Sequence, residues 1–477
     1  MILYSSQFAG KGEKEVQRLS SLKTGLFAEV KKKVPLDPTR AILVSFLAVI
    51  LLGALLLCLP VSGRNGESTR FGDALFTSVS ATCVTGLVVV DTYSHWSVFG
   101  RAVILCLIQV GGLGFMSIAS LLSMLIGKRS SLRTKMVATQ SLNLFDTSDI
   151  RRTVKHIFLG TAAFEGAAAF IFTVRFCSEY PFWSALGRGV FLSVSAFCNA
   201  GFDLCGDKNP FGSLCGYSGD PVINTVVMAL IVIGGLGFFV WEEIYTKHRF
   251  SRFSLFTRVV LVTTLILIVG GAAGFFATEY SNPGTLGALS FPGKILASLF
   301  QSVSPRTAGF ATVNLSGLRD VTKVLTIMLM FVGGSPGSTA GGVKTSTVAV
   351  LMIACVATLR DRRKVNIHGR RISEETVLKA FSLAVSVFFL IVAASFALSC
   401  IDSVPFIDAM FECTSAVCTV GSSIVGTSTL GPASKIILMI LMYLGRVGLL
   451  SASFAVFNRP SDRTNSIGYP EARILIG

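Results

Sequence analysis

Hydrophobic residues in this chain form long uncharged runs separated by shorter polar or basic stretches. The clearest run, residues 41–59, has no charged side chain over about 20 residues, the length that crosses a bilayer core. Similar runs follow at 101–126, 154–174, 222–244, 257–278, 323–356, 377–399 and 435–457. The pattern predicts an all-α integral membrane protein with eight transmembrane helices.

Composition agrees with this prediction. Hydrophobic residues make up 52% of the chain, charged residues only 14%, and the mean hydropathy is +0.69. Soluble globular proteins average about 25% charged residues. The composition therefore excludes an ordinary soluble protein.

Basic residues predict the orientation in the membrane. Most of the 42 Lys and Arg residues lie in segments 1–40, 127–158, 245–258, 359–374 and 458–477, and such residues accumulate on the cytoplasmic side. Both termini are therefore predicted to be cytoplasmic, with tails at 1–40 and 458–477. Basic loops facing anionic lipid explain the net charge of +16 without nucleic acid.

A short polar segment recurs four times between the apolar runs. The copies are SVSATCVTGL (78–87), SVSAFCNAGF (193–202), SVSPRTAGF (302–310) and CTSAVCTVGS (413–422). Each contains a Gly near its end, at Gly86, Gly201, Gly309 and Gly421, and the third copy is one residue shorter. Such self-similarity indicates a repeat architecture.

A second glycine follows at a nearly constant distance in three copies. It stands at Gly111, Gly333 and Gly445 in repeats one, three and four, and at Gly234 in repeat two, which carries an insertion. The unit is therefore a span, a short re-entrant pore loop and a second span. Its predicted copies are 41–126, 127–244, 245–358 and 359–457, the second and fourth with a preceding basic loop.

Four re-entrant segments around one pseudo-four-fold axis would direct backbone carbonyls at a common line. Non-helical backbone at membrane depth occurs only where it is buried in protein or lines a watery cavity, and carbonyl rings replace the hydration shell of potassium in channel filters. Asp73 and Asp408 fit the first turns of pore helices, where a carboxylate complements the helix dipole. The repeats thus predict a cation pore.

These motifs resemble those of the membrane subunit of Trk/Ktr potassium uptake systems, and the eight-span length favours the Ktr type. The resemblance covers nearly the whole chain from about residue 40. GGSPGSTAGGVKTSTVAVL (333–351) is similar to the family's intramembrane gating loop, and IGYPEARILIG (467–477) to the Ktr C-terminal end. The resemblance implies potassium uptake across a bacterial cytoplasmic membrane.

The resemblance also implies the filter residues, whose carbonyls would bind the transported K⁺. They are Val84, Thr85 and Gly86, Asn199, Ala200 and Gly201, Thr307, Ala308 and Gly309, and Thr419, Val420 and Gly421. In relatives that favour sodium, Ser replaces the first of these glycines. All four glycines are present here, which indicates potassium.

The implied gate lies under the filter. Its residues are Gly333, Gly334, Ser335, Gly337, Ser338, Thr339, Gly341, Gly342, Lys344 and Arg446. Glycines and a proline cannot hold a continuous helix across 333–345, so the second span of repeat three is predicted to be broken. Arg446 would act as a positive barrier; the alternative is a structural ion pair with Glu165 or Glu412.

Several other side chains are expected to have structural roles. Cys83, Cys198 and Cys418, three residues before the glycine in three repeats, are expected to pack behind the filter rather than bind a soft metal. Arg306 replaces them in repeat three and is expected to pair with an acid. A disulfide between Cys205 and Cys215 is an open alternative in an oxidising compartment.

The four scattered histidines and the lack of HExxH argue against an enzyme. A Na⁺- or H⁺-coupled secondary transporter of another cation or small solute is the alternative function, because such proteins also use interrupted helices. No cofactor is expected in this chain. The resemblance implies a homodimer and a cytosolic nucleotide-binding regulatory ring docked on the basic inner loops.

Overall fold

The computed structural model describes residues 38–114, 150–362, 364–367 and 370–448. The N-terminal tail up to residue 37, the basic loop 127–149 and the C-terminal tail lie outside these residues. So do the ends of two predicted spans, 115–126 and 449–457. The predictions for these segments stay predictions.

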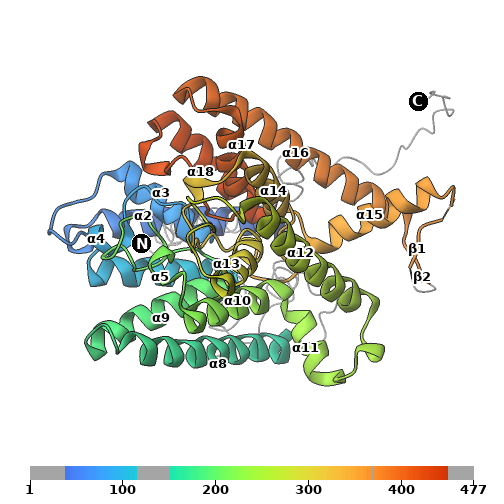
Figure 1. Ribbon diagram of the computed structural model, residues 1–477, viewed down its shortest axis with the longest axis horizontal. Helices are drawn as coiled ribbons and strands as arrows, with labels where there is room; N and C mark the ends of the chain where they lie inside the picture. The colour runs from blue at the N-terminus through green and yellow to red at the C-terminus, as the bar shows by residue number, and fades with distance from the viewer. Residues whose placement is uncertain (1–37, 115–149, 363, 368–369, 449–477) are drawn as a thin grey trace, which may run out of the picture.

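The described chain is mostly helical (Figure 1). Four long helices each precede a shorter buried one: α2 (Pro38–Cys58) and α3 (Phe71–Thr82), α8 (Ile150–Phe176) and α9 (Phe182–Cys198), α12 (Leu255–Glu279) and α13 (Phe291–Val303), α16 (Glu374–Asp402) and α17 (Phe406–Val417). A third helix follows each pair: α5 (Val98–Leu113), α10 (Pro221–Leu236), α14 (Asp320–Phe331) and α18 (Pro432–Val447). Asp73 and Asp408 lie in the first turns of α3 and α17.

The remaining elements are two further helices, α11 (Phe238–Lys247) and α15 (Thr345–Leu359), and several short connections. The short connections are α4 (Thr92–His95), η1 (Pro60–Ser62), η2 (Cys215–Tyr217), η3 (Phe250–Arg252), η4 (Leu315–Gly317), η5 (Thr427–Thr429) and the antiparallel pair β1 (Asn366–Ile367) and β2 (Arg370–Arg371). The hairpin lies at the edge of the molecule beyond α15 (Figure 1).

Among the described residues, three helices are long and apolar enough to cross a membrane: α8 from Lys155, α12 and α16. The pair α10 and α11 counts as a fourth if it forms one span, but the two helices meet at 96°. The apolar run 222–244 is therefore not one straight helix, and whether it crosses a membrane stays a prediction. Gly237 separates the helices with φ +92°, a conformation that favours glycine and ends a helix.

Helix contacts follow a closed order. Each long helix packs on the buried helix that follows it, α2 on α3, α8 on α9, α12 on α13 and α16 on α17. Each third helix then packs on the buried helix of the next group: α5 on α9, α10 on α13, α14 on α17, and α18 back on α3. The four buried helices therefore share the centre of the molecule.

Serine hydroxyls fasten the buried helices to the long ones. Ser78 donates to the Ile50 carbonyl at 2.6 Å, Ser193 to that of Glu165 at 2.7 Å and Ser302 to that of Ile268 at 2.7 Å. These are the first serines of the recurring SVS segments. Hydrogen-bonding them across the helix pair removes the cost of burying a hydroxyl.

Candidate functional site

A segment of three residues follows each buried helix, and all four segments share one backbone conformation. These glycine segments are 84–86, 199–201, 307–309 and 419–421. In each, the first residue has a positive φ (Val84 57°, Asn199 60°, Thr307 80° and Thr419 50°) and so does the final glycine, with φ between 71° and 96°. The middle residue keeps negative φ. Left-handed backbone is uncommon outside glycine, so its recurrence at the same position in all four segments indicates a common role.

The glycine segments touch each other in a closed ring. A Cβ added at Gly86 would lie under 3.0 Å from the Ala200 carbonyl oxygen, and one at Gly201 equally close to that of Ala308. The same holds for Gly309 against Val420 and for Gly421 against Thr85. Glycine is required at all four positions, because any side chain would collide with the carbonyl of the neighbouring segment.

The buried helices hold these segments by backbone hydrogen bonds. Thr85 N donates to the Ser80 carbonyl, Ala200 N to that of Ser195 and Val420 N to that of Ser415, each at 2.8 Å. In the shorter third copy, Ala308 N and Gly309 N both donate to the Ser304 carbonyl, at 2.9 and 3.2 Å. The C-terminal ends of four helix dipoles thus lie beside the ring, a field that favours cations.

Two segments gain a further bond from a serine side chain. Gly86 N donates to Ser80 Oγ and Gly421 N to Ser415 Oγ, both at 3.0 Å. The acid Glu412 holds the residues after the fourth segment, since its Oε1 accepts from Ile424 N at 2.9 Å and Val425 N at 3.2 Å. The support from Ser80 and Ser415 was not expected from the sequence, and Glu412 was expected only as an alternative partner of Arg446. The recurrence of the serine in each copy was the available signal.

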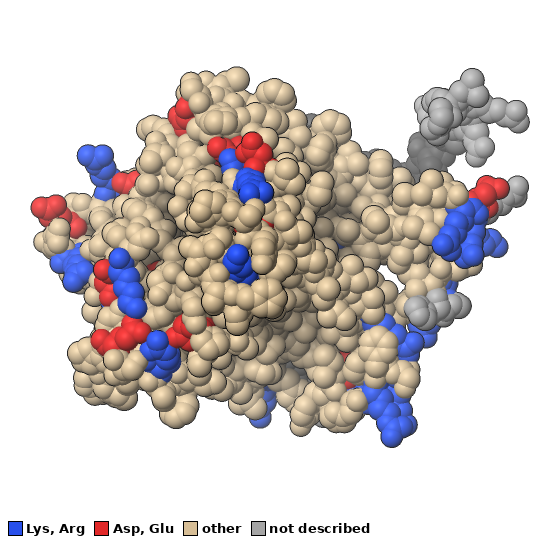
Figure 2. Space-filling view, viewed as in Figure 1, with Lys and Arg blue, Asp and Glu red and all other residues tan. Residues whose placement is uncertain are grey.

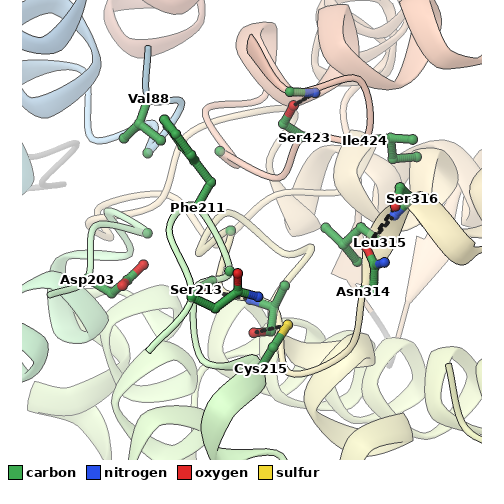
Figure 3. A pocket seen from close by; sticks show the side chains of 18 of the residues that line it. Val88, Asp203, Phe211, Ser213, Cys215, Asn314, Leu315, Ser316, Ser423 and Ile424 are labelled. Carbon is green, nitrogen blue, oxygen red and sulfur yellow. Dashed lines mark hydrogen bonds between the residues drawn. The ribbon is translucent and has the colours of Figure 1, made fainter. Parts of the chain in front are cut away.

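A cavity of about 640 Å³ opens over the ring (Figure 3). Its lining includes all four glycines, Gly86, Gly201, Gly309 and Gly421. Polar groups around it include Asp91, Asp203, Ser213, Asn314 and Ser423. Two carboxylates and several hydroxyls give hydrated cations a favourable approach to the ring.

One of these carboxylates has a shifted pKa. The pKa of Asp203 is raised to about 6, chiefly by burial and also by the carboxylates of Asp91 and Asp207, while a hydrogen bond from Cys205 N and the charge of Arg188 oppose the rise. Arg188 also forms a salt bridge to Asp207, at 3.0 Å, and donates to the Leu204 carbonyl at 2.6 Å. The loop above the ring is thereby anchored to α9.

On the opposite side of the ring lies the 333–345 loop, which separates α14 from α15. The loop closes on itself, because Gly333 N donates to the Val343 carbonyl at 2.9 Å. It is also joined to the end of α10: Ser335 N donates to the Gly235 carbonyl at 2.9 Å and Thr339 N to that of Gly234 at 3.3 Å. The expected break in 323–356 is confirmed.

The loop lies directly against two glycine segments. Thr339 Oγ1 donates to the Phe197 carbonyl at 3.2 Å and accepts from Asn199 Nδ2 at 3.5 Å. A Cβ at Gly341 would collide with Thr419, and one at Gly342 would lie 3.3 Å from Cys418. The structure therefore brings the predicted gate residues and the predicted filter residues into contact.

Arg446 joins this loop to the end of α5. Its guanidinium donates to the carbonyls of Thr339 and Gly111, and to that of Gly112 at 3.2 Å. Lys344 donates to the Ala340 carbonyl at 2.7 Å. Both cations are thus solvated by backbone carbonyls, the form of charge compensation available where water is scarce.

The alternative ion pair of Arg446 with Glu165 or Glu412 is wrong for the described residues. Glu165 instead accepts from Gln109 Nε2 at 3.1 Å, and Glu412 from Ser423 and the backbone after it. The sequence pattern identified Arg446 as unusual but could not identify its partners. Every residue has a backbone carbonyl, so the sequence does not show which carbonyls Arg446 contacts.

The expected acid partner of Arg306 is also not found among the described residues. The Arg306 side chain is buried, 7% exposed, and its Nε has no hydrogen-bond partner there. Cys205 and Cys215 are free thiols, so the open alternative of a disulfide is not realised. Cys83, Cys198 and Cys418 are fully buried at the ends of α3, α9 and α17.

The second landmark glycine has a packing role that the sequence did not reveal. A Cβ at Gly111 would collide with the carbonyl of Thr82, one at Gly234 with that of Phe197 and one at Gly445 with that of Val417. These glycines let the third helix of each group approach the end of a buried helix. In repeat three, Gly333 meets Gly341 of the loop instead.

Comparison with known proteins agrees with this architecture. Residues 23–467 match the family TrkH, described as cation transport protein. The chain is 39% identical to the Ktr system potassium uptake protein B of Bacillus subtilis over 449 residues, which is 94% of this chain and 99% of that protein. It is 36% identical to the potassium/sodium uptake protein NtpJ of Enterococcus hirae, with the same coverage.

A solved structure shares the fold. The potassium transporter TrkH from Vibrio parahaemolyticus aligns with a TM-score of 0.68 over 89% of this chain and 86% of that chain, at 17% sequence identity. Transport proteins of this kind carry out no covalent chemistry, so the chain is not an enzyme. By its family match and its relatives, this chain is a membrane protein of the TrkH cation transport family.

Proposed function

We propose that this chain takes up potassium through a pore on the axis of the four glycine segments. The closed ring of these segments carries the proposal. Positive φ alternates with negative φ along each segment, an arrangement that would turn successive carbonyls toward the pore axis, and stacked carbonyl rings can replace the hydration shell of K⁺. The cavity of 640 Å³ would be the outer entry.

Four units of span, pore loop and span would surround this pore. The closed order of helix contacts supports the arrangement, because each unit touches the next and the fourth touches the first. Eight crossings, with both termini cytoplasmic, follow from the apolar runs and the basic loops. The side of the ring that carries the 333–345 loop then faces the cytoplasm.

The 333–345 loop and Arg446 would form the gate. The loop lies immediately against the glycine segments, and the Arg446 guanidinium adds positive charge on the path of the ion. A cation leaving the ring would meet an obstruction and a repulsive field together. Conduction therefore requires that the loop move away and that the bonds of Arg446 to Thr339 and Gly111 break.

Regulation by a separate cytosolic subunit is the second part of the proposal. One relative is named as part of a Ktr system, which implies more than one component. Basic side chains gather around the β1–β2 hairpin and η3, where Figure 2 shows blue surface with few acids. A nucleotide-binding ring with acidic contact surfaces would dock there, on a homodimer of this chain, and shift the gate.

Growth and flux measurements test the proposed function. Expression in a cell that lacks potassium uptake should restore growth at low potassium, and the purified chain in liposomes should take up rubidium. An imposed sodium or proton gradient in the same liposomes reveals coupling, because coupled uptake would depend on that gradient. Neither rescue nor rubidium uptake by a folded, membrane-inserted chain would refute the proposal.

A further inference from the structure

The insertion that makes repeat two longer than the others crosses the outer cavity. We call residues 203–215 the outer strap. Its backbone is fixed in an unusual form, with φ +59° at Phe211 and +47° at Ser213. It reaches the first repeat, where Phe211 N donates to Asp91 Oδ1 at 3.3 Å. Figure 3 shows Phe211 and Ser213 on this segment, among the residues that line the cavity.

The outer strap also bonds to the third repeat in both directions. Leu214 N donates to the Ala311 carbonyl at 2.9 Å, and Ala311 N donates to Ser213 Oγ at 3.2 Å. The thiol of Cys215 lies 3.7 Å from the same carbonyl. Ala311 is only two residues beyond Gly309. Both polar groups of its peptide backbone are therefore held by the strap.

The third glycine segment lacks the serine side-chain bond that supports the first and fourth segments. Gly86 and Gly421 bond to serine hydroxyls of their buried helices, but Gly309 N bonds only to the Ser304 carbonyl. The Ser304 hydroxyl turns away and donates to the Phe310 carbonyl. The Ser195 hydroxyl of repeat two has no hydrogen-bond partner among the described residues either, so only repeats one and four have this serine bond.

The strap is anchored firmly enough to provide the missing support. Its first half is tied to α9, because Arg188 bonds to Asp207 and to the Leu204 carbonyl. Gly206 lies against the carboxylate of Asp91, and a Cβ at this position would collide with it. Two neighbouring repeats thus fix the strap, which then bonds to the third.

We propose that the outer strap holds the third glycine segment at the spacing that suits potassium, with Ser213 as the positioning residue. The inference rests on the proposed potassium pathway and adds a selectivity determinant to it. A segment released from Ser213 would shift by tenths of an ångström, and its carbonyls could close around a smaller cation. Loss of the bond therefore favours sodium relative to potassium.

Ser213→Gly tests the strap in the full chain. Glycine accepts the positive φ of this position, so the loop retains its backbone while the hydroxyl is lost. In liposomes, the ratio of rubidium to sodium uptake should fall roughly two- to ten-fold, the range expected for one hydrogen bond. Ser218→Ala is the matched control, because Ser218 lines the same cavity but has no bond to Ala311. An unchanged ratio in Ser213→Gly overturns the proposal.

Reaction of Cys215 with a membrane-impermeant maleimide, followed by peptide mass spectrometry, provides a second readout. If Ser213 positions the segment through the strap, Ser213→Gly should expose Cys215 and speed its alkylation as the ion ratio falls. A lower ratio with unchanged alkylation would overturn the positioning role, as would faster alkylation with an unchanged ratio. Absence of rubidium uptake by the unsubstituted chain would instead refute the proposed function.

Discussion

The glycine ring and the 333–345 loop beside it are built differently. Four segments of different sequence make up the ring itself, share one pattern of φ angles and meet glycine to carbonyl. Beside the ring, on the side away from the cavity, one repeat alone contributes the 333–345 loop, which is held partly by bonds from Thr339 and Arg446. A structure made of repeated backbone tolerates varied side chains but no added Cβ. A structure held by individual side-chain bonds can be released one bond at a time.

The largest expected effect comes from Gly86→Ser, which disturbs the ring of glycine segments. Its φ of +96° disfavours any side chain, and the new Cβ would collide with the Ala200 carbonyl. We expect the preference for rubidium over sodium in liposome uptake to fall roughly ten-fold or more, the equivalent of 1–2 kcal/mol of backbone strain.

Gly66→Ser is the control for Gly86→Ser. Gly66 also has a positive φ, +73°, but an added Cβ there would meet nothing within 4 Å. Its substitution strains the backbone without touching the ring. Equal selectivity in the two variants would contradict the view that contact between segments controls selectivity.

Arg446→Ala should release the 333–345 loop, which only one repeat contributes. The substitution removes the charged bonds to the Thr339 and Gly111 carbonyls. Such bonds are worth about 1.5–3 kcal/mol each, so rubidium flux in liposomes without any partner should rise roughly ten-fold or more. Lys435→Ala, at the opposite end of the same helix, should leave the flux unchanged. No rise in a folded Arg446→Ala protein would remove Arg446 from the gate.

Thr339→Val should have a smaller effect in the same direction. Valine keeps the shape but loses the Oγ1 bonds to the Phe197 and Gly234 carbonyls, while the backbone carbonyl bonded by Arg446 remains. Basal rubidium flux should rise about two- to ten-fold. Ser338→Ala, which loses only a bond inside the loop, is the control. If the flux of Ser338→Ala rises as much as that of Thr339→Val, the stiffness of the loop controls the gate, and the bonds of Thr339 to the Phe197 and Gly234 carbonyls do not.

The smallest effect should come from external pH acting through Asp203. Its pKa of about 6 means that the carboxylate is charged at pH 7.5 and becomes protonated as the pH falls through 6. Uptake at low external rubidium should then drop by roughly half, since one charge near the entry is partly screened by salt.

Asp203→Asn should abolish this dependence by keeping the side chain neutral at all pH values. Asp320→Asn provides the comparison, because Asp320 is exposed and does not line the cavity. A pH profile that is the same in Asp203→Asn and in the unsubstituted chain would show that Asp203 is not the group that titrates.

Much of the arrangement could be predicted from local pattern. Apolar runs indicated membrane helices, and the Gly-Pro-rich stretch at 333–345 indicated a broken one, because these signals depend on residues close in the chain. The sharp bend at Gly237 was not predicted. Its flanks are apolar on both sides, and a glycine within such a run does not by itself reveal a left-handed conformation.

Partners of buried charges were predicted poorly. Arg446 was expected either to act as a positive barrier in the pore or to pair with an acid, and Arg306 was expected to pair with an acid. Arg446 meets carbonyls from two distant segments, at Thr339 and Gly111, and Arg306 has no acid partner among the described residues. Every residue carries a carbonyl, so only the folded backbone decides which carbonyls converge on a cation.

The sequence by itself determined the repeated unit, the four glycines and the unusual third copy, because these are periodic features that survive without knowledge of the fold. Tertiary structure alone decided that the glycines face neighbouring carbonyls around a ring, and that the insertion of repeat two reaches Ala311 of repeat three. The physical reason is distance along the chain. Contacts between repeats join residues about a hundred positions apart, and their geometry arises only when all four units pack together.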